Sequence, residues 1–212
     1  MSQGLTRILA EPTLFDVGED MMLERCTWLN EPSEWHLDAG ILNVTTDRET
    51  DFWRETHYGF TRDSGHFFGC VADGDFTAEI RVRARYEELY DQAGIMVRID
   101  EAHWVKAGVE MSNGMALLSS VLTLGKSDWA MGIYGDDPRD FRMRVTVAEG
   151  VLRLQVSADG VIWHLARLSP FPRAESYKVG PMCCTPERSG LKISFSDFRV
   201  MPPLNRALHD LT

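Results

Sequence analysis

Apolar and polar residues alternate with a period of two through most of the chain from Phe67 onward. In residues 78–86, for example, Ile80, Val82 and Ala84 share one parity, and charged residues occupy most of the other. Successive side chains of a strand point to opposite faces of a sheet, whereas a helix needs a period of 3.6. The pattern therefore predicts strands that bury one face.

Turn signals separate the alternating segments. Asn113-Gly114, Glu149-Gly150 and Asp159-Gly160 each stand between two such segments, and Asn-Gly and Asp-Gly favour tight hairpins. About ten or eleven short strands at this spacing predict an all-β fold, an antiparallel β-sandwich of two packed sheets. The last strand, residues 191–200, changes parity near Ser196-Asp197, which predicts a β-bulge there.

Helical signals are weak. We expect one helical turn at Glu87-Glu88-Leu89 and a short helix at Asn205 to Leu211, after Pro202-Pro203. No linker, internal repeat or low-complexity stretch interrupts the 212 residues. We therefore predict a single domain over residues 1–212, with a core at about residues 23–200 and short terminal extensions.

The charge balance excludes some partners. The chain has 22 basic and 32 acidic residues, a net charge of −10, so neither nucleic acid nor an anionic membrane surface is expected to bind it. No window approaches the roughly 18 apolar residues of a membrane span, and Met1 to Ala10 lack the apolar stretch of a signal peptide. We expect a cytoplasmic protein.

The cysteines and histidines suggest no metal site. The chain has four cysteines and six histidines, but no pair has C-x-x-C spacing and no H-x-x-x-H occurs. Few cysteines in a chain of this length are typical of a reduced, intracellular protein, in which buried thiols behave as small hydrophobes. We expect neither a metal nor a cofactor.

One predicted hairpin has an unusual polar face. Residues 92–99 and 104–110 are joined by a short connection, so side chains of one parity should be neighbours. Those side chains are Gln92, Gly94, Met96, Arg98, Trp104, Lys106, Gly108 and Glu110. Glycine in the middle of a strand often marks the close approach of a ligand or of another chain segment. The face is either a binding site or an ordinary solvated surface.

The preceding segment, Asp51 to Phe60, is rich in aromatic residues and has no clear period. Trp53 and Tyr58 could stack on a ligand, while Arg54 and His57 could orient it; alternatively, these aromatic residues only cover the core. Thr123 has the parity of the polar face, and Ser127-Asp128-Trp129 could form part of its rim. His66, by contrast, is expected to be a structural histidine.

Several short motifs follow one another along the chain: Asp51-Phe52-Trp53-Arg54, His57-Tyr58-Gly59, Tyr90-Asp91-Gln92-Ala93-Gly94, Trp104-x-Lys106-x-Gly108-x-Glu110, Ser127-Asp128-Trp129, Ser157-x-Asp159-Gly160-x-x-Trp163 and Phe195-x-Asp197-Phe198. In this order they resemble the signature of the regulation-of-enolase-type family of unknown function. The resemblance spans about Leu23 to Val200. It implies a concanavalin A-like lectin/glucanase fold, a jelly roll whose concave face commonly binds sugars, and no established reaction.

The chain departs from the glucanases of that fold, which carry closely spaced acidic residues, E-x-D-x-E or a variant, on one strand. Here the best candidate strand has Lys106-x-Gly108-x-Glu110, one amine and one carboxylate. Glycoside hydrolysis with retention needs two carboxyl groups roughly 5–5.5 Å apart. Asp91 could supply the second group only from the end of the neighbouring strand. A standard retaining glucanase is therefore disfavoured.

The sequence leaves three functional hypotheses, of which we favour the first. It is binding of a small carbohydrate or sugar acid, with stacking and polar roles shared by Trp53, Arg54, His57, Tyr58, Gln92, Trp104, Lys106 and Glu110. The second is a hydrolase or other enzyme on a small sugar or sugar acid, with Glu110 as acid or base and Lys106 or His57 as its partner; alternatively, Lys106 and Glu110 form a plain salt bridge. The third is a metabolic regulator that acts through protein contacts.

Overall fold

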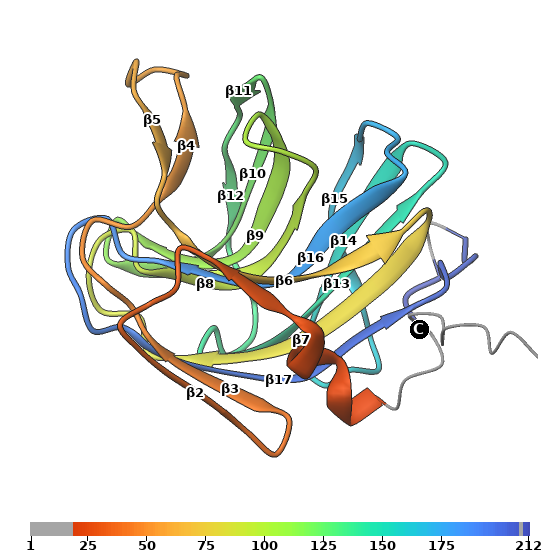
Figure 1. The fold of residues 1–212 in the computed structure, drawn as a ribbon, viewed down its shortest axis with the longest axis horizontal. Helices are drawn as coiled ribbons and strands as arrows, with labels where there is room; N and C mark the ends of the chain where they lie inside the picture. The colour runs from red at the N-terminus through yellow and green to blue at the C-terminus, as the bar shows by residue number, and fades with distance from the viewer. Residues whose placement is uncertain (1–18, 208–209) are drawn as a thin grey trace, which may run out of the picture.

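The computed structural model describes residues 19–207 and 210–212 (Figure 1). A 3-10 helix at Glu19–Arg25 is followed, in these residues, by seventeen strands. The strands are β1 (Thr27–Leu29), β2 (Glu34–Asp38), β3 (Ile41–Thr45), β4 (Phe52–Arg54), β5 (Thr61–Asp63), β6 (His66–Asp73), β7 (Phe76–Ala84), β8 (Gln92–Arg98), β9 (His103–Ser112), β10 (Met115–Leu124), β11 (Lys126–Ser127), β12 (Ala130–Gly132), β13 (Asp140–Ala148), β14 (Val151–Ser157), β15 (His164–Pro170), β16 (Ser176–Cys184) and β17 (Lys192–Met201).

The strands form two stacked antiparallel sheets, as the sequence predicts. The first sheet has eight strands, ordered β1-β6-β16-β8-β9-β10-β11, and β12 also pairs with β10. The second has seven strands, ordered β15-β14-β13-β7-β17-β3-β2. Figure 1 shows the layers one above the other. There are more strands than the sequence indicated because several contain only two or three residues, too few to show alternation.

One apolar core fills the space between the sheets. Val97 in β8 and Val105 in β9 contribute from the first sheet, and Val82 in β7 and Val145 in β13 from the second; each is at most 1% exposed. These residues belong to the parity that the alternation assigned to the buried face. The prediction of an all-β antiparallel sandwich is confirmed.

The predicted bulge in the last strand is also present. The register between β17 and β7 shifts between Ser196 and Arg199, and Asp197 has a positive φ of 54°. The extra residue brings Phe195 and Phe198 to the same buried side although their parities differ.

The weak helical predictions are wrong. At Glu87-Glu88-Leu89 the chain turns without forming a helix, because the Asp91 carboxylate accepts the backbone N–H groups of Glu87 and Glu88. Of the segment 205–211, the described residues are not helical. The first ten residues, in which no signal peptide was expected, lie outside the described part. No helix within 19–207 and 210–212 is long and apolar enough to cross a membrane.

The cysteines pack as buried free thiols in the part of the chain that the structure describes. Cys183 and Cys184 follow each other in β16, so their side chains point to opposite faces. Cys183 packs in the core between the sheets, and Cys184 packs in a second apolar cluster. The strand geometry therefore keeps this vicinal pair apart.

That second cluster fixes the architecture of the site. The β4–β5 hairpin is a separate two-stranded unit that stands on the outer, concave face of the first sheet, opposite β10–β12 (Figure 1). Its apolar side chains pack with those of the sheet face in a cluster of Phe52, Trp53, Phe67, Met96, Trp104, Val121, Met182 and Cys184. The hairpin thus becomes a packed wall beside the concave face.

Candidate functional site

The floor of the site is the predicted hairpin of β8 and β9. Gln92 stands opposite Glu110, and Met96 stands opposite Lys106, so these side chains share one face, as strand parity predicted. Gln92, Lys106 and Glu110 are each at most 5% exposed. The polar face is therefore not an ordinary solvated surface, because other parts of the chain cover it.

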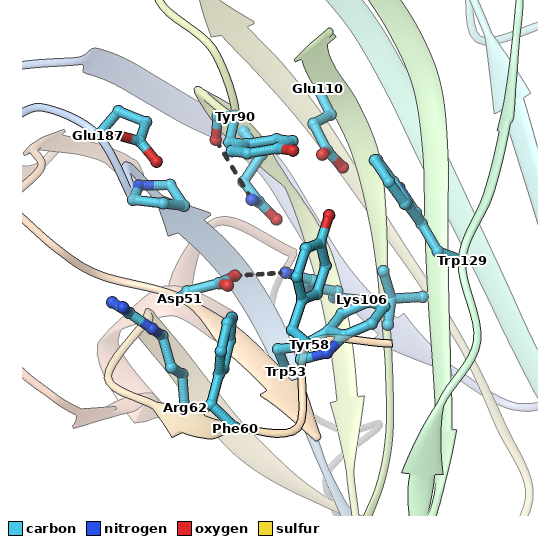
Figure 2. Close-up of a pocket in the computed structure, with 13 residues that line it drawn as sticks. Asp51, Trp53, Tyr58, Phe60, Arg62, Tyr90, Lys106, Glu110, Trp129 and Glu187 are labelled. Atoms are coloured by element: carbon cyan, nitrogen blue, oxygen red, sulfur yellow. Dashed lines mark hydrogen bonds and ion pairs between the residues drawn. The ribbon is translucent and has the colours of Figure 1, made fainter. Parts of the chain in front are cut away.

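A cavity of about 220 Å³ opens between this floor and the hairpin wall (Figure 2). It is bordered by β4–β5, β8–β10, the loop before β8, the segment between β11 and β12, and the loop after β16. The lining residues are Asp51, Trp53, Tyr58, Phe60, Arg62, Tyr90, Gln92, Lys106, Glu110, Val121, Trp129, Pro186 and Glu187. Five aromatic rings therefore border a floor with an amine, an amide and carboxylates.

Lys106 pairs with Asp51 and not with Glu110. Its Nζ lies 3.0 Å from Asp51 Oδ1. Burial alone would lower the pKa of Lys106, but the attraction of Asp51, with smaller contributions that include Glu110, outweighs it and raises the pKa. Lys106 is therefore a charged ammonium held by a carboxylate that reaches down from the start of the hairpin.

Glu110 is bound by neutral donors. Its Oε2 accepts a hydrogen bond of 2.7 Å from Ser119 Oγ, and the Trp129 indole N–H donates to the same Ser119 oxygen at 3.2 Å. Burial is the largest effect on this carboxyl group and raises its pKa, although Lys106 and Ser119 partly oppose that effect. Glu110 is thus a buried carboxyl group without an ion pair among the described residues.

Tyr58 and Tyr90 meet across the cavity from two separate loops. A hydrogen bond to Tyr58 is the main reason that the pKa of Tyr90 rises to about 12. The backbone at Tyr90 and at His57, beside Tyr58, is left-handed, with φ of 63° and 62°. Such conformations are costly outside glycine and need a structure that holds them. Local strain therefore accompanies the placement of these two rings.

Four of the aromatic side chains contact one another edge to face, and Phe60 is stacked on Tyr58. Trp53 lies 5.7 Å from Tyr58 and 6.5 Å from Trp129, and Tyr90 lies 6.2 Å from Trp129, all as ring-centroid distances. Tyr58 and Trp129 remain 48% and 38% exposed. These rings join the hairpin wall to the opposite wall and leave apolar surface for a ligand.

Side chains outside the cavity anchor the hairpin. Asp63 in β5 accepts two hydrogen bonds from the Arg98 guanidinium, at 2.6 and 2.8 Å. Arg54 donates its backbone N–H to Ser127 Oγ and its Nε–H to the Gly125 carbonyl. The predicted site residue Arg54 therefore fastens β4 to the β10–β11 turn and does not line the cavity.

Two further predicted site residues, Trp104 and His57, do not line the cavity. Trp104 shares the parity of the polar face, but the hairpin covers that end of the sheet, so its ring is fully buried against Phe52 and is not available for stacking. His57 is exposed near the hairpin tip, with its ring 4.9 Å from that of Tyr58, and does not line the cavity. The stacking role predicted for Trp104 is wrong because burial excludes it.

The glycines of the floor serve strand packing. A Cβ at Gly94 would lie 1.9 Å from the Ala107 carbonyl oxygen, and one at Gly108 would lie 2.0 Å from the Ala93 carbonyl oxygen. The sequence left open whether these glycines allow the approach of a ligand or of another chain segment. The structure shows that they allow the approach of another chain segment. Gly94 and Gly108 face each other across β8 and β9 and allow the backbones to approach.

Asp91 and His66 are structural. The fully buried Asp91 carboxylate pairs with Arg188 at 2.5 Å, so it supplies no second catalytic carboxyl group. His66 Nε2 accepts the Asp47 backbone N–H, which leaves Nδ1 to donate to the Asn30 carbonyl oxygen. The structural interpretation of His66 is confirmed. Asp128 pairs with Arg167, and of the predicted rim only Trp129 lines the cavity.

The sequence reasoning missed several lining residues. Asp51 and Tyr90 stand inside the quoted motifs, so the motif pattern carried a signal for them. Phe60 and Arg62 lie in the same hairpin, whereas Pro186 and Glu187 come from a distant loop that shows no pattern. Among the described residues, no group of three or more His, Cys, Asp or Glu side chains is arranged to hold a metal ion.

Comparison with known proteins gives one family and one broad fold. Residues 28–203 match the family described as "Protein of unknown function (DUF1349)". "Regulation of enolase protein 1" of Saccharomyces cerevisiae is 60% identical over 190 residues, 90% of this chain and 96% of the relative. The crystal structure of a functionally unknown S. cerevisiae protein superposes with a TM-score of 0.85 at 59% identity, covering 86% of this chain and 99% of that one.

More distant structures share the fold alone. The GH43 protein BlXynB of Bacillus licheniformis, in a mutant form, has a TM-score of 0.63 at 14% identity, over 84% of this chain and 37% of that one. The exoplasmic/lumenal domain of VIP36, in its Ca²⁺/Man3GlcNAc-bound form, has a TM-score of 0.52 at 9% identity, over 90% and 89% of the two chains. Both similarities agree with the antiparallel β-sandwich.

Proposed function

Because the chain belongs to the family described as "Protein of unknown function (DUF1349)", a description that assigns no activity, we propose its function from the cavity: binding of a small carbohydrate on the concave face. The observation that carries this proposal is the combination of five aromatic rings with a buried polar floor in one cavity. Rings stack on the apolar faces of a sugar, and amide and carboxyl groups bond its hydroxyls.

The size of the cavity supports a small ligand. Its volume of about 220 Å³ lies below the roughly 300–1,000 Å³ of pockets that hold drug-sized molecules. One or two sugar units are therefore better candidates than a long chain. The fold supports the same class of ligand, since the distant relative VIP36 was crystallised with Man3GlcNAc.

Binding is better supported than catalysis. Of the groups considered as partners of Glu110 in a reaction, Lys106 is held by Asp51, and His57 lies outside the cavity. Glu110 remains one buried carboxyl group with neutral donors. Such a group can bond sugar hydroxyls directly, whereas glycoside hydrolysis requires a second carboxyl group that takes part in the reaction, and the neighbouring Asp51 is held in an ion pair by Lys106.

Isothermal titration calorimetry with a panel of neutral and amino mono- and disaccharides tests the proposal. At least one sugar should bind, and Trp129→Ala should weaken that binding about tenfold, because an exposed ring of the wall is lost. Ile133→Ala, at a side chain 85% exposed and outside the cavity, should change nothing. Absence of binding at millimolar concentration across the panel would refute the proposal.

A second candidate is regulation of a protein partner, favoured by the name of the 60% identical yeast relative, "Regulation of enolase protein 1". Enolase is then the first partner to test. Tyr58, Phe60 and Trp129 are exposed around the cavity, where a partner could contact them. Pull-down of purified enolase by wild type and by Trp129→Ala, with and without a bound sugar, tests this candidate. Capture of enolase that changes with the sugar indicates a sugar-responsive regulator, whereas no capture indicates a protein that binds sugar alone.

A further inference from the structure

Within residues 19–207 and 210–212, the Glu110 carboxyl group has no ion-pair partner. Its side chain is 5% exposed, and its hydrogen-bond donor, the Ser119 hydroxyl, is neutral and in turn accepts a hydrogen bond from the neutral Trp129 indole. The nearby ammonium of Lys106 is bound to Asp51 instead. Burial of an ionised carboxylate is unfavourable unless a counter-charge accompanies it. A cation that entered the cavity would supply the missing charge.

The surroundings of Glu110 also suit a cation. Figure 2 shows its carboxyl group pointing into the space between Tyr90, Tyr58 and Trp129. Electron-rich rings attract cations through their faces, and the attraction is larger where water is excluded. Rings and a carboxylate together form the kind of site that recognises ammonium groups.

The charged side chains that line the cavity also favour a cation, because acidic groups outnumber basic ones. Three carboxyl groups, those of Asp51, Glu110 and Glu187, line the cavity with two basic side chains, Lys106 and Arg62. Lys106 is neutralised by Asp51, and the Arg62 guanidinium lies 5.1 Å from the ring centre of Phe60, at the opposite end of the cavity from Glu110 in Figure 2. The end that Glu110 occupies is therefore negative.

We propose that the natural ligand carries a cationic nitrogen, which forms an ion pair with Glu110 between the rings of Tyr58, Tyr90 and Trp129. The inference rests on the proposed function because it concerns the same cavity. Together they define the ligand as a small sugar with a free ammonium group, an amino sugar. The same charges oppose a sugar acid, whose carboxylate would face Glu110.

Matched pairs of ligands test this inference. Calorimetry compares glucosamine, galactosamine and mannosamine, each protonated, with glucose, galactose and mannose, and adds glucuronic acid and the tetramethylammonium ion. At least one hexosamine should bind ten or more times tighter than its parent hexose, and glucuronic acid should bind least. A hexose that binds as tightly as its amine would overturn the inference and leave the proposed function standing.

Two variants test whether the preference for the amine comes from an ion pair with Glu110 or from the negative charge of the whole lining. Glu110→Gln keeps the shape of the side chain and should reduce the preference for the amine to about parity, because affinity for the amine falls much more than affinity for the neutral hexose. Glu187→Gln removes an equal charge from an exposed part of the lining and should keep the preference. Equal loss in both variants would contradict pairing with Glu110.

The tetramethylammonium ion distinguishes the two proposals. If it binds through Glu110 while no sugar binds, the cation site is supported and the carbohydrate function fails. If none of these probes binds, both proposals fail. Circular dichroism of each variant establishes that it is folded, so a loss of binding reports on the site.

Discussion

At the scale of single residues, the site depends on which carboxyl group pairs with the Lys106 ammonium. Asp51 approaches Lys106 from the hairpin at 3.0 Å, while Glu110, on the same strand face as Lys106, keeps neutral donors. A buried ion pair is expensive to break because the remaining charge is left without a partner. The pair therefore holds Lys106 in place and leaves Glu110 for a ligand.

Glu110 should destabilise the unliganded protein at neutral pH. Burial raises its pKa in the folded state, so the folded protein binds more protons than the unfolded chain between the ordinary and the raised value. The contribution of Glu110 to the free energy of unfolding therefore falls as pH rises through that interval. Glu110→Gln should be more stable than wild type at pH 7, and the difference should shrink toward pH 4 in urea denaturation. A less stable variant at pH 7 would contradict this.

At the scale of elements, the β4–β5 hairpin is a wall fixed by a few strong contacts. It buries Phe52 and Trp53 on the sheet face, and the Arg98–Asp63 pair binds its second strand. In the part of the chain that the structure describes, its short strands pair with each other and with no third strand, so these side chains, together with Arg54, connect it to the rest of the fold. The position of Tyr58 and Phe60 depends on that connection.

Loss of the Arg98–Asp63 pair should loosen the hairpin. Hydrogen bonds between charged groups contribute about 1.5–3 kcal/mol, so Arg98→Met should raise amide hydrogen exchange in residues 52–63 at least tenfold. Mass spectrometry of the corresponding peptides measures it. Arg139→Met, which removes an exposed pair with Asp137, is the matched control and should leave exchange in the hairpin unchanged. Unchanged exchange in Arg98→Met would show that the apolar packing and the contacts of Arg54 and Asp51 hold the hairpin without this pair.

The close approach of β8 and β9 depends on glycine at the position where the two backbones meet. Gly94→Ala places a methyl group 1.9 Å from the Ala107 carbonyl oxygen, a backbone atom that cannot move aside cheaply. We expect a loss of about 3 kcal/mol or more in the free energy of unfolding. Gly132→Ala, with nothing within 4 Å of the added atom, should change it by less than about 0.5 kcal/mol. Similar values for both variants would contradict the close approach.

At the scale of the whole molecule, two apolar clusters share one sheet. The eight-stranded sheet packs one face against the second sheet and the other against the hairpin. Its central strands are therefore covered on both sides, which explains why polar side chains such as Lys106 and Gln92 are buried. Unfolding of either cluster exposes a face of the same strands.

Thiol labelling measures this shared burial. Cys26, Cys70, Cys183 and Cys184 are free and at most 7% exposed, and burial raises the pKa of Cys183, which disfavours the reactive thiolate. A thiol reagent should leave all four unmodified in the native protein and modify all four in denaturant. The native labelling rate should follow the global unfolding rate. Rapid labelling of one cysteine would indicate that its region opens independently.

The sequence by itself predicted strand parity, the antiparallel sandwich and the bulge near Asp197, because these follow from local alternation and turn residues. It also placed Gln92, Lys106 and Glu110 on one face, since a short hairpin fixes the register of its two strands. Parity cannot show what covers a face. For that reason the burial of Trp104 beneath the hairpin was not predictable.

The composition of the site was decided by the tertiary structure. Asp51, Tyr90 and Glu187 reach the cavity from segments far apart in the sequence, and loops without periodicity carry no signal of their direction. The position of the hairpin relative to the sheet, to within a few ångströms, determines which carboxylate pairs with Lys106. Local alternation determined the sheets, whereas the packing of non-local segments determined the charge and shape of the cavity.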